Sequence, residues 1–176
     1  MNLSEKIALR LLSNIDPEKA HNLAIKALKF GFVPKTKVFH AKSLELSVAG
    51  LKFKNPLGLA AGFDKNAEAI KPLLKFGFGF IEVGAVTPLA QTGNPKPRLF
   101  RLKEDNAVIN RFGFNNDGMR KVSKRLLKRP ANGIVGLNLG ANKDSADRIN
   151  DFSTVFKACS EFIDFATVNV SSPNTE

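Results

Sequence analysis

The sequence predicts an α/β fold that comprises the first four strands of a TIM (β/α)8 barrel, preceded by a helical hairpin and a short β-hairpin. Two observations predict it. From Leu57 onward, short apolar runs alternate with amphipathic segments, and such alternation of strands with helices is typical of a parallel sheet with right-handed crossovers. The chain has 176 residues, whereas a complete barrel has typically about 250. We therefore expect an incomplete barrel.

Residues 1–40 are expected to form two amphipathic helices. Apolar side chains recur at helical spacing in residues 2–13, and Asp16 followed by Pro17 is a typical start for a second helix, Glu18–Phe30, which Gly31 ends. The nearby lysines would let both helices lie on an anionic membrane surface. The same periodicity also fits a helical hairpin packed on its own domain, in which His21 caps or packs.

Residues 41–176 are expected to form the half-barrel. Polar and apolar side chains alternate around Ala49-Gly50, which predicts a β-hairpin over residues 43–54. A Pro/Gly-rich loop, residues 87–97, leads into residues 98–102 and 107–116. The parallel units are predicted as strands 57–61, 80–86, 134–139 and 165–170 and helices 67–76, 118–129 and 152–162.

Composition and charge narrow the possible function classes. Lys and Arg total 27 against 16 for Asp and Glu, and the net charge of +11 favours an anionic partner. Because the basic residues are spread along the chain, no nucleic acid is expected. A single cysteine and two distant histidines argue against a disulfide or a metal site. Without a long apolar window or a signal-peptide pattern, we expect no transmembrane span, no export and a cytoplasmic setting.

Small residues and amides gather where the predicted strands end. Gly62 and Ala85 follow or close two strands, and Asn138 and Asn169 stand near the ends of two others. The carboxyl ends of parallel strands carry the functional groups of α/β proteins, and small residues let a flat ligand approach the backbone closely. The pattern therefore predicts a planar, hydrogen-bonding ligand such as a flavin.

Several polar residues allow two interpretations. Lys65 follows the first strand and is either functional or simply solvated, and Asn110, Asn115 and Asn116 either bind a ligand or cap the next helix. Cys159 lies on an apolar helical stripe and is expected in the core. Glu82 lies within an apolar strand, so we expect a Lys or Arg partner in a structural role. No Gly-x-Ser-x-Gly elbow surrounds the Ser171-Ser172 pair, which argues against a hydrolase.

Four longer motifs are specific enough to indicate a family. They are NPLGLAAGFDK at 55–65, GNPKPRLFR at 93–101, NRFGFNN at 110–116 and NVSSPNT at 169–175. In this order they resemble class 2 dihydroorotate dehydrogenase, the quinone-dependent FMN flavoprotein of pyrimidine (UMP) biosynthesis. Serine rather than cysteine in the fourth motif, together with the helical N-terminal extension, favours the membrane-associated class.

The resemblance implies a role for each matched residue. It assigns the cofactor FMN to Ala61, Gly62, Phe63, Asp64, Lys65, Ala85, Asn138 and Asn169. It assigns the pyrimidine substrate to Lys65, Asn110, Arg111, Phe112, Gly113, Phe114, Asn169 and Asn174. Ser172 matches the catalytic base, and Thr175 and a water near Phe114 are candidates for a proton relay. His21 and Arg101 match residues near a quinone tunnel formed by the N-terminal helices.

The implied reaction is oxidation of dihydroorotate to orotate. Ser172 would take a proton from C5 of the substrate while C6 delivers a hydride to FMN, which a membrane quinone then reoxidises. The resemblance also implies peripheral attachment to the anionic cytoplasmic face of the inner membrane, and no metal.

The chain departs from this family in length, which is about half of the family's. Because the later flavin and phosphate sites of the barrel are absent, we expect a truncated chain that, made alone, neither holds FMN tightly nor turns over dihydroorotate. Two alternatives remain open. One is another FMN barrel, such as a tRNA dihydrouridine synthase, which needs a catalytic cysteine. The other is a non-catalytic half-barrel that self-associates through its open strand edges.

Overall fold

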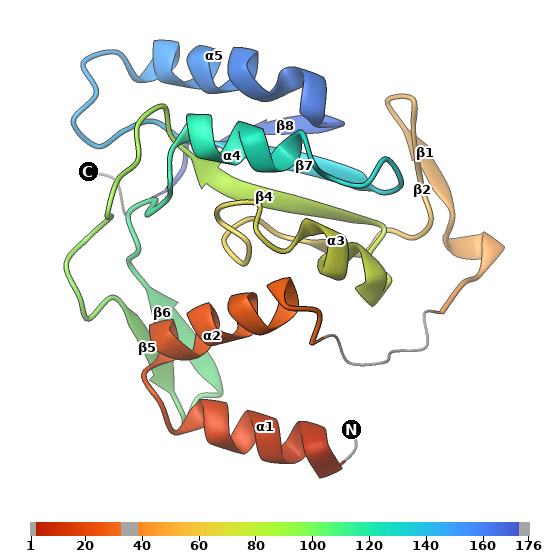
Figure 1. Cartoon of the computed structure of the whole chain (residues 1–176), viewed down its shortest axis with the longest axis vertical. Helices are drawn as coiled ribbons and strands as arrows, with labels where there is room; N and C mark the ends of the chain where they lie inside the picture. The colour runs from red at the N-terminus through yellow and green to blue at the C-terminus, as the bar shows by residue number, and fades with distance from the viewer. Residues whose placement is uncertain (1–2, 33–38, 173–176) are drawn as a thin grey trace.

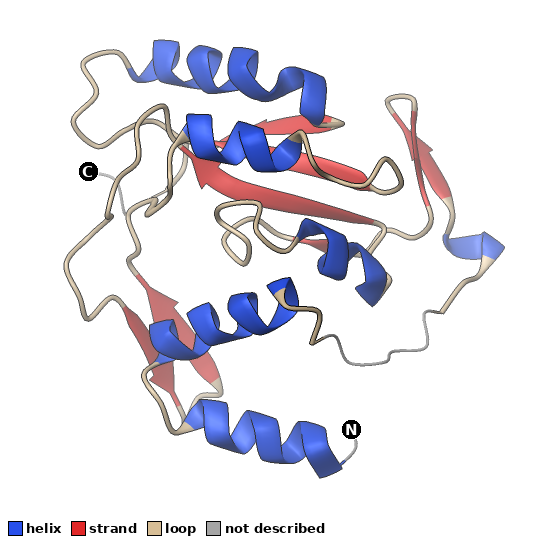
Figure 2. Ribbon diagram, viewed as in Figure 1, coloured by secondary structure: helices blue, strands red, loops and turns tan. Residues whose placement is uncertain are grey.

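The structure, a computed structural model, describes residues 3–32 and 39–172 (Figure 1). Its centre is a parallel sheet with the strand order β3, β4, β7, β8. These strands are Gly58–Leu59, Phe80–Val86, Ile134–Leu139 and Phe165–Val168 (Figure 2). β3 and β8 are the two edges of this sheet, which is therefore not closed. The predicted incomplete barrel is confirmed.

Within this parallel sheet, a helix lies in each connection from one strand to the next, as is usual for parallel pairing. These helices are α3 (Ile70–Leu73, continued by a 3-10 turn over Leu74–Phe76), α4 (Met119–Leu126) and α5 (Arg148–Cys159, continued by a 3-10 turn over Ser160–Phe162). Alternate side chains of the central strands point toward the helices. These strand side chains pack against those of α4 and α5 and form the core. Its fully buried members include Ile81, Val83, Val135 and Leu137 of the strands and Val122, Leu126, Val155 and Cys159 of the helices.

The opposite face of the sheet has an aromatic layer near the amino ends of the strands. The rings of Phe53 and Phe80 and those of Phe80 and Phe165 meet edge to face, with centroids 5.5 and 5.8 Å apart. Gly58 and Gly136 leave room for these rings, because an added Cβ would overlap Phe80 or Phe165. Along each strand, alternation places the next side chains of this face closer to the carboxyl end, where the candidate site lies.

The N-terminal helices pack beside the barrel half. α1 (Leu3–Ser13) leads into α2 (Pro17–Lys29), whose N-cap Asp16 accepts a 2.9 Å hydrogen bond from the Lys19 N–H. α2 lies beside the hairpin of β5 (Leu99–Leu102) and β6 (Ala107–Asn110) (Figure 1), and Ile25 and Leu28 of α2 join the main core. A second hairpin, β1 (Leu46–Val48) and β2 (Leu51–Phe53), precedes β3.

Some boundaries differ from the sequence prediction. The strand predicted over 57–61 is limited to Gly58–Leu59, and the helix predicted from residue 67 begins at Ile70, because Asp64 draws the preceding backbone into a hydrogen-bonded turn. α5 begins four residues before its predicted start, since Asp147 caps it through the Asn150 N–H. β8 ends at Val168 rather than at 170, and the β5–β6 hairpin was not predicted.

Candidate functional site

A cavity of about 320 Å³ lies at the carboxyl ends of the four parallel strands. It unites most of the residues that the resemblance assigns to FMN and to the pyrimidine. The lining residues are Ala61, Gly62, Lys65, Gly84, Ala85, Asn110, Phe112, Gly113, Phe114, Asn115, Asn138, Asn169 and Ser172. They come from the loops after β3 and β8, the ends of β4 and β7, and the end of β6 with the segment that follows it.

A chain of hydrogen bonds forms one wall of this cavity. Asn169 Nδ2 donates to Asn138 Oδ1 at 3.0 Å, and Asn138 Nδ2 donates to Glu82 Oε1 at 2.7 Å. The expectation of a Lys or Arg partner for Glu82 is corrected, because the partner is the amide of the neighbouring strand. This series of hydrogen bonds fixes the orientation of the Asn138 and Asn169 side-chain amides, and therefore which of their polar atoms face the cavity.

Small residues let the strand ends lie close together. The Gly62 N–H donates to the Gly84 carbonyl at 2.9 Å, and the Gly84 N–H donates to the Asp64 carbonyl at 3.2 Å. Gly84 has φ +109°, and a Cβ there would lie 2.7 Å from the carbonyl oxygen of Asn138. A residue with a side chain at Gly84 would therefore be strained and would push β4 and β7 apart.

Lys65 is held in a fixed position at the cavity. Its Nζ donates to the Gly62 carbonyl at 2.7 Å and lies 4.3 Å from the centre of the Phe112 ring. Burial lowers the pKa of Lys65 to about 8; the charges of Glu18 and Asp64 oppose this shift, and that of Arg98 adds to it. Of the two interpretations of Lys65, simple solvation is excluded by this partly buried, contacted position.

Three of the described residues that the resemblance assigned to the site do not line this cavity. Asp64 is buried, and its carboxylate accepts the N–H groups of Glu68 and Ala69 at 2.8 and 2.7 Å. Burial raises the pKa of Asp64, while backbone hydrogen bonds oppose the shift. Arg111 donates to the Pro97 carbonyl at 3.0 Å. The third residue, Phe63, meets His21 edge to face.

Of the two residues matched to a quinone tunnel, His21 belongs to α2 and Arg101 contacts the turn between α1 and α2. The His21 ring lies 5.3 Å from that of Phe63 and borders a second cavity of about 310 Å³ between α2 and the Lys65 loop. Burial and the charge of Lys65 lower the pKa of His21. Arg101 donates to the carbonyls of Leu12, Ser13 and Ile15, where α1 joins α2.

The asparagines after β6 separate into different roles. Asn116 is buried and accepts the Gly118 N–H at 2.8 Å before α4, and it donates to Thr87 Oγ1 at 2.8 Å, so its role is structural. Asn115 lines the cavity, and its Oδ1 is buried without a hydrogen-bond partner among the described residues. Ser172 lines the cavity, whereas Asn174 and Thr175 lie outside the described residues.

Sequence reasoning missed two charged residues close to the site, Glu18 and Arg98. They form a buried ion pair although 80 positions separate them in the chain. No periodicity or motif signals such a contact, because it depends on α2 packing beside the loop that precedes β5.

The fold defines this chain as the first half of a (β/α)8 barrel, with a cavity at the carboxyl ends of its strands. A model of the family described as dihydroorotate dehydrogenase matches residues 43–176. The chain belongs to the dihydroorotate dehydrogenase family, as its motifs predicted.

Individual relatives agree with this assignment. The dihydroorotate dehydrogenase (quinone) of Cereibacter sphaeroides strain KD131 is 58% identical over 100% of this chain and 50% of the relative. That of Agrobacterium fabrum is 58% identical over 92% of this chain and 44% of the relative. The crystal structure of DHODH from Eimeria tenella with ferulenol is 41% identical, with a TM-score of 0.88 over 97% of this chain and 48% of that one. The chain thus spans about half the length of the relatives it matches.

Proposed function

We propose that this chain provides the amino-terminal half of an enzyme that oxidises dihydroorotate to orotate and passes the electrons to a quinone. One observation carries the proposal: residues from four strand ends and from the segment after β6, matched by motif to flavin and pyrimidine positions, line one cavity. Quinone-dependent dihydroorotate dehydrogenases among the relatives support the same reaction.

FMN is the cofactor that this cavity fits best. A flat, polar ring system needs small residues on one side and amide groups at its edge, and the cavity offers both in Ala61, Gly62 and Ala85 and in Asn138 and Asn169. The amide chain that ends at Glu82 orients these edge groups. FMN supplies the hydride acceptor, a chemistry that no amino-acid side chain provides.

Dihydroorotate suits the remaining part of the cavity because it combines a carboxylate with a ring amide. Among the described lining residues, Lys65 alone carries a charge, and that charge is positive. Asn110 and Asn169 provide amides, and Phe112 and Phe114 provide apolar surface for the pyrimidine ring. Lys65 would bind the carboxylate, since its ammonium group is held in place before the ligand arrives.

Ser172 is the proposed base that takes the proton from the substrate. It follows β8 and lines both the main cavity and a neighbouring one of about 310 Å³. A serine hydroxyl is a weak base near neutral pH, so it must hand the proton on. This neighbouring cavity beside Ser172, lined also by Asn142 and Arg148, offers a polar path for that proton.

The proposed acceptor side is the N-terminal helical layer. Within residues 3–32 and 39–172, no helix is both long and apolar enough to cross a membrane. α1, α2 and the residues after them nevertheless expose large apolar side chains, namely Ile7, Leu9, Leu11, Leu23, Phe30 and Phe32. Apolar side chains beside lysines suit a surface that rests on an anionic membrane and admits a quinone. We propose peripheral attachment at the cytoplasmic face of the inner membrane.

The test is a fusion of residues 1–176 to the C-terminal half of the Cereibacter sphaeroides relative. This fusion should restore growth without uracil to a bacterium that lacks its own dihydroorotate dehydrogenase, and the purified protein should be yellow and reduce a quinone analogue with dihydroorotate. Two controls match this test. The C-terminal half alone should not restore growth, and the fusion with Ser172→Ala should keep the flavin and lose turnover. A yellow fusion with no activity on dihydroorotate would contradict the proposal.

A further inference from the structure

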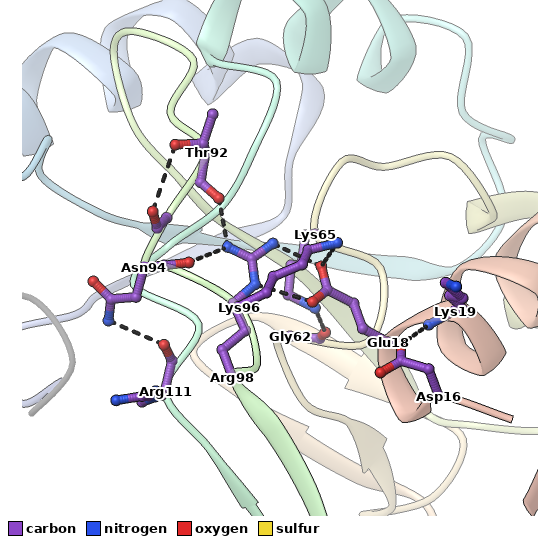
Figure 3. Close-up of polar contacts among 11 residues, drawn as sticks. Asp16, Glu18, Lys19, Gly62, Lys65, Thr92, Asn94, Lys96, Arg98 and Arg111 are labelled. Atoms are coloured by element: carbon purple, nitrogen blue, oxygen red, sulfur yellow. Dashed lines mark hydrogen bonds and ion pairs between the residues drawn. The ribbon is translucent and has the colours of Figure 1, made fainter.

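Glu18 in the first turn of α2 and Arg98 in front of β5 form a buried, two-point ion pair (Figure 3). Arg98 Nη2 donates to Glu18 Oε1 at 2.6 Å, and Arg98 Nε donates to Glu18 Oε2 at 3.1 Å. Only 8% of Glu18 and 6% of Arg98 is exposed. The hydrogen bonds from Arg98 lower the pKa of Glu18. Paired N–H donors of this kind fix the guanidinium in one orientation.

Arg98 extends this contact into the loop before β5. Its Nη1 donates to the carbonyls of Thr92 and Asn94, the latter at 3.0 Å. The ion pair therefore ties the N-terminal helical layer to a loop of the barrel half. A second cation, Lys96, lies 3.4 Å from Glu18 Oε1, but its side chain is 66% exposed.

Phe112 connects the ion pair with the candidate site. The Arg98 guanidinium carbon lies 5.4 Å from the centre of the Phe112 ring, and Lys65 Nζ lies 4.3 Å from it. Two cations thus share one ring, an arrangement whose mutual repulsion a nearby carboxylate relieves. Figure 3 shows Arg98 bound to the Glu18 carboxylate and Lys65 bound to the Gly62 carbonyl, and the charge of Glu18 acts on Lys65.

We propose that Glu18 is a positioning residue, whose carboxylate holds Arg98 and, through Phe112, keeps the charged end of Lys65 in place for an anionic substrate group. The packing of α2 against the barrel half is then needed for the site to bind its substrate, in addition to holding the N-terminal helices in place. This inference rests on the proposed function, because it takes Lys65 to bind the substrate carboxylate.

The charged groups around Lys65 set the direction of the expected effect. They are Glu18 and His21 of α2, Asp64 of the same loop, and Arg98. Burial lowers the pKa of Lys65 to about 8, and the charge of Glu18 opposes that shift. Without the Glu18 charge, the pKa of Lys65 falls further and the ammonium group loses its proton at lower pH.

The experiment compares Glu18→Gln, Glu18→Asp and Lys96→Ala in the flavin-loaded fusion described above. The titration of Lys65 is followed by NMR with ¹³Cε-lysine, with Lys65→Arg to assign the signal, and kcat and KM for dihydroorotate are measured against pH. Glu18→Gln should lower the pKa of Lys65 and raise KM at pH 8 about three- to tenfold, with a smaller change in kcat. Glu18→Asp, which keeps the charge, should restore most of both values.

Lys96→Ala is the matched control, because it removes an exposed contact to the same carboxylate and should change KM less than about twofold. A Lys65 titration and a KM in Glu18→Gln equal to those of Lys96→Ala would overturn the inference. If Glu18→Gln does not fold, Glu18→Asp provides the comparison: its shorter side chain draws the carboxylate back, so the pKa of Lys65 should fall in the same direction but by less than in Glu18→Gln. A shifted Lys65 titration in a fusion that never oxidises dihydroorotate would reject the proposed function and support the positioning role.

Discussion

Asn138 donates its side-chain amide to the Glu82 carboxylate across two neighbouring strands, at 2.7 Å. The register of β4 and β7 makes this contact possible, since Glu82 pairs with Gly136 and Asn138 is the next residue on the same face. Among the described residues, the carboxylate placed inside this apolar strand thus has an amide partner rather than a cation, and that amide is held in place at the cavity.

Asn138→Ala is expected to lower the free energy of unfolding by about 1–3 kcal/mol, because Glu82 loses a hydrogen-bond donor at a half-buried position. Urea unfolding of residues 1–176, followed by circular dichroism, measures the change. Glu82→Gln is the control, since its side-chain carbonyl still accepts from Asn138, and it should cost less. Equal stabilities for Asn138→Ala and the unmodified chain would show that this hydrogen bond carries no net stability.

Asp64 is expected to give the stability a pH dependence of defined sign. Burial raises the pKa of Asp64 above its ordinary 3.8, so the folded chain binds the proton more tightly than the unfolded chain. This carboxyl therefore contributes stability at low pH that is lost as the pH rises from 3.8 through the raised pKa. The unfolding free energy of Asp64→Asn, measured over the same pH range, should lack this decline. An identical slope in the two chains would contradict the assignment.

Lys65 is expected to weaken the fold at neutral pH. Its pKa is lowered from 10.5 to about 8, so the unfolded chain binds the proton more tightly, and stability rises as the pH increases from about 8 to 10.5. Lys65→Met should raise the free energy of unfolding at pH 7 by about 1–3 kcal/mol, and the gain should shrink toward pH 10.5.

Lys19→Met, at an exposed position of α2, is the matched control for Lys65→Met and should leave stability unchanged within about 0.5 kcal/mol. In the flavin-loaded fusion, Lys65→Met should also raise KM for dihydroorotate. A more stable but less active variant is the expected signature of a buried functional lysine. A Lys65→Met chain less stable than the unmodified one would show that the contacts of Lys65 outweigh its burial.

The sequence was sufficient for the parts of this structure that depend on local pattern. Apolar periodicity predicted β4 and β7 with their observed bounds, and Asp16-Pro17 predicted the start of α2. The short motifs contain most of the residues that line the cavity, although Phe63, Asp64 and Arg111 of the same motifs lie outside it. Patterns failed where particular side-chain hydrogen bonds decide the structure, as for the late start of α3, where Asp64 accepts the Glu68 and Ala69 N–H groups and holds the backbone in a turn.

Buried charge was the least predictable feature of the site. In the sequence, Glu18 is simply a favourable residue for the first turn of a helix, and Arg98 belongs to the motif at 93–101, which does not indicate its partner. Their pairing becomes visible only when α2 is packed beside the loop before β5.

Cys159 shows the opposite case: its apolar surroundings in the sequence predicted a core position, and burial raises the pKa of its thiol to about 11. Such a thiol does not suit the catalytic cysteine that a tRNA dihydrouridine synthase requires.

Gly136 tests whether the aromatic layer beneath the site is as tightly packed as the contacts indicate. A Cβ at this position would overlap the Phe165 ring, so Gly136→Ala should destabilise the chain by about 1–3 kcal/mol. Phe165→Leu shortens the side chain and should recover part of that loss when the two changes are combined. A double-mutant cycle of unfolding free energies measures this coupling, which should exceed about 0.5 kcal/mol because Gly136 and Phe165 are register partners on β7 and β8. Strictly additive changes would mean that the backbone, and not the ring, requires glycine at position 136.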